Sequence, residues 1–530
     1  MMKSNRSYIV SSLAAQMIMI PVILTPLFIA MLSIAGQFPG LAQLGKSTFR
    51  LIAILAAFFG PFVVGGTVGY VFSKRSKEKP ESPKVRYLTP LFPILYALIF
   101  AVLAVTLSKG NYNSQWWGIY AFKNPFFIIF DFIIAFMGLH FVMPVAELSG
   151  YLGFVGGLLL NERATKASIK NEMGKKLKII LAGVSILVVI FLGASNREII
   201  GNGFLELRYG EVTVGNDLTE FDLIKIAPFK ENNGLARLDG EASLQFEELE
   251  EMPRLDGATA AYPVYGAFVE SVYKGLGEYY EANKDSHEKD VYMAFVESKQ
   301  YPFNIVQCSK TNGAYERLIN GQTDIIFVAE PSKAQVEMSK EKGDEFVLTP
   351  IGYEAFVFFT NIKNPVENLS IQEIQDIYAG KITNWRDVGG ANKKILPYQR
   401  PENSGSQTVM ENKVMKDRTM LEPTKETYAG GMGEIISQVS NYKNAKNAIG
   451  YSFMYYSSSM IKNNQIKYIS VNGVKPTPET VRNKEYPFTV PVYAVTLKSN
   501  TNENVSKFLE WVLSDEGQNL IEKTGYVSAR

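Results

Sequence analysis

Cysteine and histidine are nearly absent from this sequence. The chain of 530 residues has a single cysteine, Cys308, and two histidines, His140 and His287, which lie far apart. One cysteine excludes a disulfide framework and a cysteine-based metal site. The separated histidines argue against a histidine metal centre or a Ser-His-Asp triad. We therefore expect no cofactor and no metal.

An excess of charge of either sign is also missing. The chain has 54 basic and 52 acidic residues, which gives a formal net charge of +2. Nucleic-acid-binding proteins concentrate positive charge, so this balance gives no indication of a nucleic-acid partner. The length is sufficient for several domains.

Long apolar runs are confined to residues 1–195, whereas residues 196–530 have the composition of a soluble mixed α/β protein. Five of the runs fit membrane-spanning helices, which need about 20 residues to cross a bilayer. The first run is too long, and is interrupted by Pro21 and Pro26, for a cleavable signal peptide. The five predicted spans are Tyr8–Ala35, Leu51–Phe72, Tyr87–Leu107, Pro125–Val145 and Ile179–Ala194.

Basic residues in the short loops predict how these spans are oriented, because loops rich in Lys and Arg stay in the cytoplasm. A topology with a cytoplasmic N-terminus and five spans places every basic cluster in the cytoplasm. The same topology places the chain from residue 196 onward outside the membrane. We therefore expect a multi-pass protein of the cytoplasmic membrane. Ala146–Leu160 is also apolar, and a sixth span there would reverse the exit, so we interpret it as an extension or a re-entrant segment. The clusters are Lys3 with Arg6, Lys74 to Arg86, and Arg163 to Lys178.

Asp131 lies in the middle of the predicted fourth span. An ionisable residue at that depth is costly, which makes it a functional candidate. The alternative is a structural residue with a partner at a helix interface or near the headgroups. Gly65 and Gly69 form a Gly-x-x-x-Gly spacing that favours close helix packing.

Residues 196–254 alternate short apolar runs with turn residues, and Phe204 to Arg208 and Phe221 to Ile226 have the alternation of strands. We predict a small β-rich linker here. From Leu255 the sequence alternates strands and helices, a pattern typical of an α/β sheet that binds ligands where strands pass into helices. Predicted strands are Ile325–Ala329, Ala355–Thr360 and Val490–Leu497. Predicted helices are Pro263–Tyr280, Gly313–Asn320, Ile371–Tyr378, Gly433–Ser440 and Val505–Leu513.

The segment from Arg400 to Ser406 carries the strongest chemical signal. It places a guanidinium, the carboxylate of Glu402 and a Ser-Gly-Ser turn before residues that can form a helix. The first turn of a helix leaves backbone N–H groups without partners at the positive end of its dipole. A small-residue entry lets an anion approach these groups, and an arginine supplies paired donors. The segment therefore predicts half of a socket for a tetrahedral oxyanion.

Two further loops have the same character. Asp256–Ala260 and Gln307–Gly313 are small, carry hydroxyls and precede predicted helices, and Glu330 lies directly after a predicted strand. Each loop alone is more often a simple helix cap, and Arg400 with Glu402 can be a surface ion pair. Three such loops with an arginine and two carboxylates favour a binding site.

Residues 255–530 resemble the phosphate-binding proteins of ABC importers (PstS type), which have a type II periplasmic-binding-protein fold. The segments that carry the resemblance are Asp376–Gly390, Arg400–Ser406, Gly257–Thr259, Pro263–Tyr265 and Tyr486–Tyr493. The resemblance implies an α/β domain of two lobes. The apolar runs place this domain after an α-helical membrane region of about five spans. Lobe one is 255–350 plus 486–530, lobe two is 351–485, and two crossing strands allow hinge closure.

The resemblance also implies the ligands of the phosphate. They are the Thr259 side chain, the Ala260 amide, Thr311 where the family has serine, Glu330 where it has aspartate, Arg400, Ser404, Gly405, and Ser406 where it has threonine. Glu402 is expected to touch Arg400 from behind. Glutamate at 330 places its carboxylate one methylene further out than aspartate.

The chemistry of these side chains favours binding of phosphate over binding of sulfate. Phosphate near neutral pH carries a proton, which a buried carboxylate accepts, whereas fully ionised sulfate meets that carboxylate as a like charge. A polar site of this kind discriminates by a factor on the order of 10⁴. Related protonated oxyanions would be accepted on the same ground.

Three classes of function follow. The leading hypothesis is a membrane-anchored extracytoplasmic phosphate-binding protein that works with an ABC-type permease. The alternative is a membrane sensor or assembly protein that binds the anion and signals to a partner through its spans. An enzyme is not expected, because the sequence offers no histidine base, metal cluster or activated nucleophile, and Ser404 has no evident base.

Overall fold

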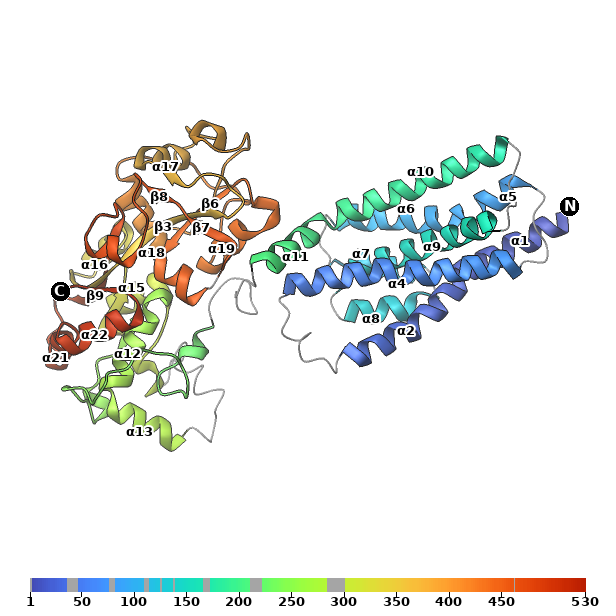
Figure 1. Ribbon diagram of the computed structural model, residues 1–530. Helices are drawn as coiled ribbons and strands as arrows, with labels where there is room; N and C mark the ends of the chain where they lie inside the picture. The colour runs from blue at the N-terminus through green and yellow to red at the C-terminus, as the bar shows by residue number, and fades with distance from the viewer. Residues whose placement is uncertain are drawn as a thin grey trace. The chain divides into compact units, whose positions relative to one another are not determined.

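The computed structural model describes residues 2–35, 46–75, 82–108, 114–123, 126–136, 139–164, 172–209, 222–283, 301–461 and 463–530. The chain forms two compact units, Met1–Tyr209 and Gly210–Arg530, which we call the helical unit and the α/β domain. Each is described by itself (Figure 1).

The helical unit consists of helices alone in its described residues. They are α1 (Met2–Ala14), a π-helical turn (Ala15–Met19), α2 (Ile20–Ala35), α4 (Lys46–Arg75), α5 (Pro83–Leu88), α6 (Leu91–Leu107), α7 (Trp116–Phe122), α8 (Ile128–Phe136), α9 (Val142–Ala164), α10 (Glu172–Ser195) and α11 (Arg197–Tyr209). Five stretches are long and apolar enough to cross a membrane: Asn5–Ile29, Ser47–Arg75, Lys84–Leu107, Val142–Asn161 and Lys178–Ser195. The described residues thus contain five apolar helices of spanning length, the number predicted.

The fourth span was predicted in the wrong place. Residues predicted as the span Pro125–Val145 form the short helix α8 and the start of α9, and Ala146–Leu160 forms the body of the spanning helix. Pro144 explains the boundary, because proline is tolerated in the first turn of a helix but interrupts a helix that runs through it. Within its span α9 is 83% buried by its neighbours, so a less apolar sequence suffices there.

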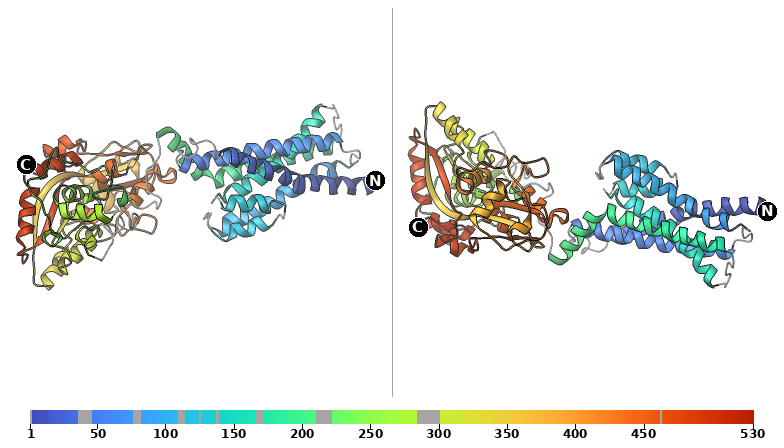
Figure 2. Two further views of the ribbon diagram at one scale, coloured as in Figure 1. Left: turned by 90° about the horizontal axis from the view of Figure 1, so that it is seen from below. Right: turned by 90° about the horizontal axis from the view of Figure 1, so that it is seen from above.

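Glycines bring α4 and α9 into direct backbone contact, and the two helices run side by side (Figures 1 and 2). A Cβ on Gly65 would lie 1.9 Å from the carbonyl oxygen of Gly150, and one on Gly69 would lie 2.1 Å from that of Phe154. From the other helix, a Cβ on Gly153 would lie 2.0 Å from the carbonyl oxygen of Phe62. The predicted close packing at Gly65 and Gly69 is confirmed, and its partner is a helix of the same chain.

Replacing Gly153 by leucine is expected to force α4 and α9 apart. The obstacle is backbone and cannot rotate away, so the cost should be about 3 kcal/mol or more. Gly183→Leu is the matched control, because a Cβ there has nothing within 4 Å. Thermal unfolding of the full chain in detergent micelles measures the difference. Equal unfolding temperatures for the two variants would contradict the packing described here.

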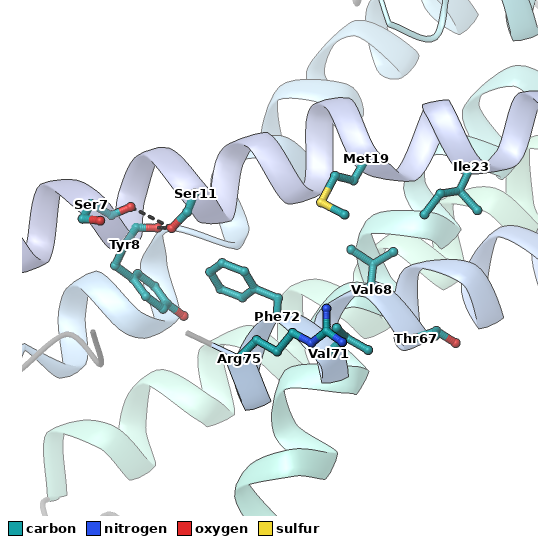
Figure 3. Close-up of a pocket in the computed structure, with 10 residues that line it drawn as sticks. All are labelled: Ser7, Tyr8, Ser11, Met19, Ile23, Thr67, Val68, Val71, Phe72 and Arg75. Carbon is teal, nitrogen blue, oxygen red and sulfur yellow. Dashed lines mark hydrogen bonds between the residues drawn. The ribbon is translucent and has the colours of Figure 1, made fainter. Parts of the chain in front are cut away.

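A groove of about 620 Å³ lies between the N-terminal helices and α4 (Figure 3). Apolar side chains, among them Met19, Ile23, Val68 and Phe72, line most of it, and Arg75 is its one cationic lining residue in the described part of the chain. The ring of Tyr8 packs against Phe72, with centroids 5.5 Å apart.

The predicted β-rich linker is wrong over its described residues. Residues 197–209 form α11, and residues 222–254 contain short 3₁₀ turns (Leu223–Ile226 and Leu249–Glu251) with no strand. The alternation at Phe204 to Arg208 also fits a helix, which buries Leu205. Glu206 fixes α11 against α4, because its carboxylate accepts hydrogen bonds from the backbone N–H groups of Ser47 (3.1 Å) and Thr48 (2.8 Å) at the start of α4.

The α/β domain has a mixed sheet in the order β1-β2-β9-β3-β6-β5, with β10 and β7 also on β3. The strands of the domain are β1 (Leu255–Gly257), β2 (Ile325–Val328), β3 (Phe346–Asn361), β4 (Asn368–Leu369), β5 (Leu396–Pro397), β6 (Ala448–Phe453), β7 (Ile466–Tyr468), β8 (Ser470–Val471), β9 (Thr489–Leu497) and β10 (Val527–Ser528). Two of them, β4 and β8, pair with each other in a separate sheet. The three predicted strands correspond to β2, part of β3 and β9.

The helices of this domain also follow the sequence pattern closely. They are α12 (Tyr262–Val272), α13 (Lys274–Asn283), α15 (Lys310–Ile319), α16 (Lys333–Glu341), α17 (Ile371–Tyr378), α18 (Gly405–Val409), α19 (Met432–Ser440), α20 (Pro478–Arg482), α21 (Glu503–Val512) and α22 (Asp515–Thr524). The helix predicted over Pro263–Tyr280 is two helices, because Tyr273 between them leaves the helical conformation at φ −95° and ψ 65°.

The strand β3 connects two lobes, each with its own apolar core. Its first part, Phe346 to Ala355, pairs with β9, and Phe356 to Thr360 pairs with β6. The change of partner comes between Ala355 and Phe356, a few residues beyond the boundary expected at 350.

Glu354 lies on β3 at this change of partner, and its side chain is buried. Burial raises its pKa to about 8, although the carboxylate accepts a hydrogen bond from the backbone N–H of Tyr455 at 3.3 Å. The folded domain therefore holds a proton that the unfolded chain loses near pH 4.5. Its stabilising contribution is fully present below that pH and is lost as the pH rises to about 8, at most about 5 kcal/mol in total.

Glu354→Gln should remove this pH dependence, so the variant should be more stable than the wild type by several degrees at pH 8 and similar to it at pH 5. The exposed Glu341→Gln serves as control. Thermal unfolding of the full chain in detergent at both pH values makes the comparison. An unchanged slope with pH in Glu354→Gln would show that Glu354 is ionised in the fold.

Candidate functional site

The first predicted loop follows β1 and leads into α12. Thr259 and Ala260 are 6% and 4% exposed and form a 3₁₀ turn with Ala261. The hydroxyl of Tyr526 donates to the Ala260 carbonyl at 2.7 Å, and the Ala258 N–H donates to the Phe327 carbonyl at 2.9 Å. These bonds fix the loop at the edge where β1 and β2 end.

Glu330 follows β2 and lies at the same edge of the sheet as the first loop. The strands β1 and β2 are parallel neighbours, with Gly257 opposite Phe327, so Thr259 and Ala329 lie at corresponding places beyond their strands. One carboxylate oxygen of Glu330, Oε1, is buried and has no hydrogen-bond partner in the described part of the chain. The other, Oε2, lies 3.8 Å from Nζ of Lys413. An acceptor is thus available beside the first loop.

The second loop is tied to the first by Asp256, a residue of β1 with no exposed surface. Its carboxylate accepts from the N–H and the hydroxyl of Ser309, both at 2.7 Å, and lies 2.8 Å from Nε of Arg317. Burial raises the pKa of Asp256, and the hydrogen bonds from Ser309 and Gly257 and the charge of Arg317 oppose that effect. Thr311, 7% exposed, follows in the first turn of α15.

The third loop brings Gly405 against the other lobe. A Cβ on Gly405 would lie 2.8 Å from the hydroxyl oxygen of Thr311 and 3.5 Å from the Cβ of Ala329. Ser404 has the extended backbone of a residue that precedes a helix, and its hydroxyl donates to the Pro401 carbonyl at 2.8 Å. Ser406 is 2% exposed, and its hydroxyl is buried without a partner among the described residues.

Arg400 is held in place by groups that the sequence analysis did not single out. Its backbone N–H donates to the hydroxyl of Tyr451 at 3.1 Å and to the side-chain oxygen of Gln407 at 3.2 Å. Tyr451 also donates to Gln407. One guanidinium nitrogen, Nη1, donates to the Ala429 carbonyl at 3.1 Å. The arginine is therefore oriented before any ligand arrives.

Glu402 is exposed in the turn that precedes α18. Its expected role behind Arg400 stays a prediction.

The two lobes touch beside this site. Asn403, in the left-handed conformation at φ 61°, accepts from the hydroxyl of Ser332 at 2.7 Å and, through its carbonyl, from Gln335 at 3.4 Å. The structure thus unites the loops of Thr259, Thr311, Glu330 and Ser404–Ser406. Asp256, Gln407, Tyr451 and Ser332 were missed, although the position of Asp256 at the head of the first loop was a usable signal.

Cys308 lies beside the first loop but offers no nucleophile. Its thiol is buried, and burial raises its pKa to about 12 despite hydrogen bonding with Tyr265 and Thr259. A thiol with such a pKa stays protonated at neutral pH.

The α/β domain is similar in sequence to known proteins. Residues 256–516 match the family model of the PBP superfamily domain. The phosphate-binding protein PstS of Staphylococcus epidermidis is 29% identical over 226 residues, 41% of this chain and 68% of that protein. PstS of Borreliella burgdorferi is 26% identical over 218 residues, 40% of this chain and 76% of that protein.

Among solved structures, a Clostridium perfringens protein crystallised with bound phosphate is 26% identical. The aligned region comprises 52% of this chain and 98% of that protein, with a TM-score of 0.39. Residues 256–516 thus match the PBP superfamily domain and are similar in sequence to phosphate-binding proteins.

Proposed function

We propose that this chain is a membrane-anchored protein that captures inorganic phosphate outside the cytoplasmic membrane. Five helices of suitable length and apolarity support the anchoring. Sequence similarity of the α/β domain to phosphate-binding proteins supports the ligand. The N-terminus is placed in the cytoplasm on the basic loops, as in the sequence analysis.

The observation that carries the proposal is a pair of buried polar atoms on opposite lobes. The Ser406 hydroxyl and Oε1 of Glu330 both lie without partners in the described residues. Their sequence neighbours, Gly405 and Ala329, pack against each other. Buried polar groups are normally hydrogen-bonded. A hydroxyl that can donate and a carboxylate that accepts together suit an oxyanion that carries a proton.

The remaining ligands complete this socket. Arg400 supplies charge and paired donors, and the entries of α15 and α18 supply N–H groups. Closure of the lobes about β3 would bury the ion, and the contacts of Asn403 with Ser332 and Gln335 would hold the closed state. The proposed ligands are Thr259, Ala260, Thr311, Glu330, Arg400, Ser404, Gly405 and Ser406.

Calorimetric titration of the purified full chain tests the proposal. Phosphate should bind with a 1:1 stoichiometry, and sulfate should compete weakly. Absence of phosphate binding at millimolar concentration would refute it.

An ABC-type permease is the partner implied by the resemblance to importer-associated proteins. Cross-linking and purification from membranes should recover that permease. Recovery of a membrane signalling protein in its place would replace the import role with a sensing role and leave phosphate capture untouched.

A further inference from the structure

A cluster of ionisable side chains is buried inside the helical unit, away from the phosphate site. Lys123 follows α7, Asp131 lies on α8, and Glu147 lies on α9. The side chains of Lys123 and Glu147 are 0% and 1% exposed, and Asp131 is 1% exposed. The residues around them, such as Trp117 and Phe130, belong to the apolar core of this unit.

Glu147 has a complete set of partners. Lys123 forms an ion pair with its Oε2, and Tyr120 donates to the same oxygen at 2.9 Å. Tyr151 donates to Oε1 at 3.1 Å. The ammonium of Lys123 also lies 3.5 Å from the centre of the Tyr120 ring. Further hydrogen bonds stabilise a buried ion pair, and here the two tyrosine hydroxyls satisfy the carboxylate while the ring of Tyr120 faces the ammonium.

Asp131 has no such partners. Both of its carboxylate oxygens are buried, and neither has a hydrogen-bond partner among the described residues. The helices packed against α8 are α2, α7 and α9. The ionisable groups near Asp131 are Tyr120 on α7, Lys123 directly after it, and Glu147 on α9 with its partner Tyr151, whereas α2 has none in its sequence.

The charges of this cluster do not balance if both carboxylates are ionised. There is one ammonium for two carboxyl groups, and the ion pair with Glu147 already neutralises it. An unpaired carboxylate in an apolar interior is strongly disfavoured, and such a group takes up a proton or a cation. A metal ion would have to sit beside the ammonium of Lys123, and the described residues offer no group of three or more potential ligands of the His, Cys, Asp and Glu types. A proton needs only one acceptor oxygen.

We propose that Asp131 is a proton-binding site inside the helical unit. It holds an exchangeable proton while Lys123 neutralises Glu147. When the proton leaves for water, the resulting carboxylate competes with Glu147 for the flexible ammonium of Lys123. The cluster is then an element with two arrangements that proton occupancy selects. This site exceeds what anchoring requires and is independent of phosphate capture.

Infrared spectroscopy of the full chain in lipid nanodiscs tests the proposal directly. The measurement uses a Glu354→Gln background, because burial raises the pKa of Glu354 to about 8 and its protonated carboxyl would contribute to the same band. At neutral pH the C=O band of a protonated carboxyl should be present, and it should be lost on Asp131→Asn. The exposed Asp417→Asn is the matched control and should keep the band. Identical carboxyl bands with and without Asp131→Asn would overturn the proposal.

A second, independent test asks which further substitution restores the unfolding temperature of Lys123→Met. If Asp131 is protonated, removal of the ammonium leaves only Glu147 charged. The lowered unfolding temperature should then be restored by Glu147→Gln and not by Asp131→Asn. The opposite rescue would show that Asp131 is the ionised partner of Lys123 and would overturn the proposal. A higher unfolding temperature in sodium salt than in choline salt, lost on Asp131→Asn, would also overturn the proposal. The cation bound at Asp131 would then be a metal ion.

Discussion

Replacing Arg400 by alanine is expected to abolish phosphate binding by the full chain. The guanidinium is held in advance by the Ala429 carbonyl, and the backbone of Arg400 is held by Tyr451 and Gln407. Its charge-assisted bonds to the anion would be lost, and the enclosed anion would keep an unpaired charge. Loss of one partner of such a buried charged pair costs about 3–5 kcal/mol, which lowers affinity by about 100-fold to 1,000-fold or more.

Arg386→Ala provides the matched control. Arg386 lies in the same lobe with a 64% exposed side chain and pairs only locally with Asp387, so its removal should leave phosphate affinity unchanged. Arg400→Lys should recover part of the affinity, because lysine keeps the charge but not the paired donors. Calorimetric titration of the three variants with phosphate distinguishes these outcomes. Wild-type affinity in Arg400→Ala would exclude Arg400 from the site.

Replacing Glu330 by glutamine is expected to change which anion the site accepts. The free Oε1 of Glu330 is the acceptor assigned to the proton of phosphate. The amide of glutamine has no negative charge and can donate, so it stops repelling sulfate and loses part of the preference for a protonated anion. From a selectivity on the order of 10⁴, the ratio of phosphate to sulfate affinity should fall about 100-fold or more.

Glu341→Gln is the control for this change, because Glu341 is exposed at the end of α16 in the same lobe. Competition titration with sulfate against bound phosphate measures the ratio in each variant. If sulfate stays excluded from Glu330→Gln, the selectivity does not come from this carboxylate. The extra methylene of glutamate relative to aspartate would then direct the side chain elsewhere.

Much of the fold could be predicted from local patterns. The amphipathic helices α17 and α19 and the buried strands β2 and β9 match their predicted positions because their apolar periodicity agrees with their final environment. The failures come from tertiary surroundings that local patterns do not report. Hydropathy measures preference for an apolar environment, and it does not distinguish lipid from neighbouring helices. The apolar helix α9 is enclosed by its neighbours, and the predicted fourth span did not coincide with it. The strand-like run at Phe204 lies in α11, whose Glu206 contacts the start of α4, a contact between distant segments.

The binding site divides in the same way. Small, hydroxyl-bearing residues before helices are a local signal, and they identified the loops of Thr259, Thr311 and Ser404 to Ser406. The role of Asp256 in tying Ser309 to the first loop is not local, because the two residues are 53 positions apart. The support of Arg400 by Tyr451, 51 positions away, could not be read from the sequence for the same reason.

The sequence by itself therefore determined the chemical types at the site, the number of apolar helices and the division into a helical and an α/β part. Residue identity and short-range spacing carry that information. The tertiary structure decided which groups meet: Gly405 with Thr311, Asp256 with Ser309, and Asp131 beside a Lys123–Glu147 pair that is already complete. Those contacts join distant segments, and burial there determines which polar atoms are satisfied and which remain available to a ligand.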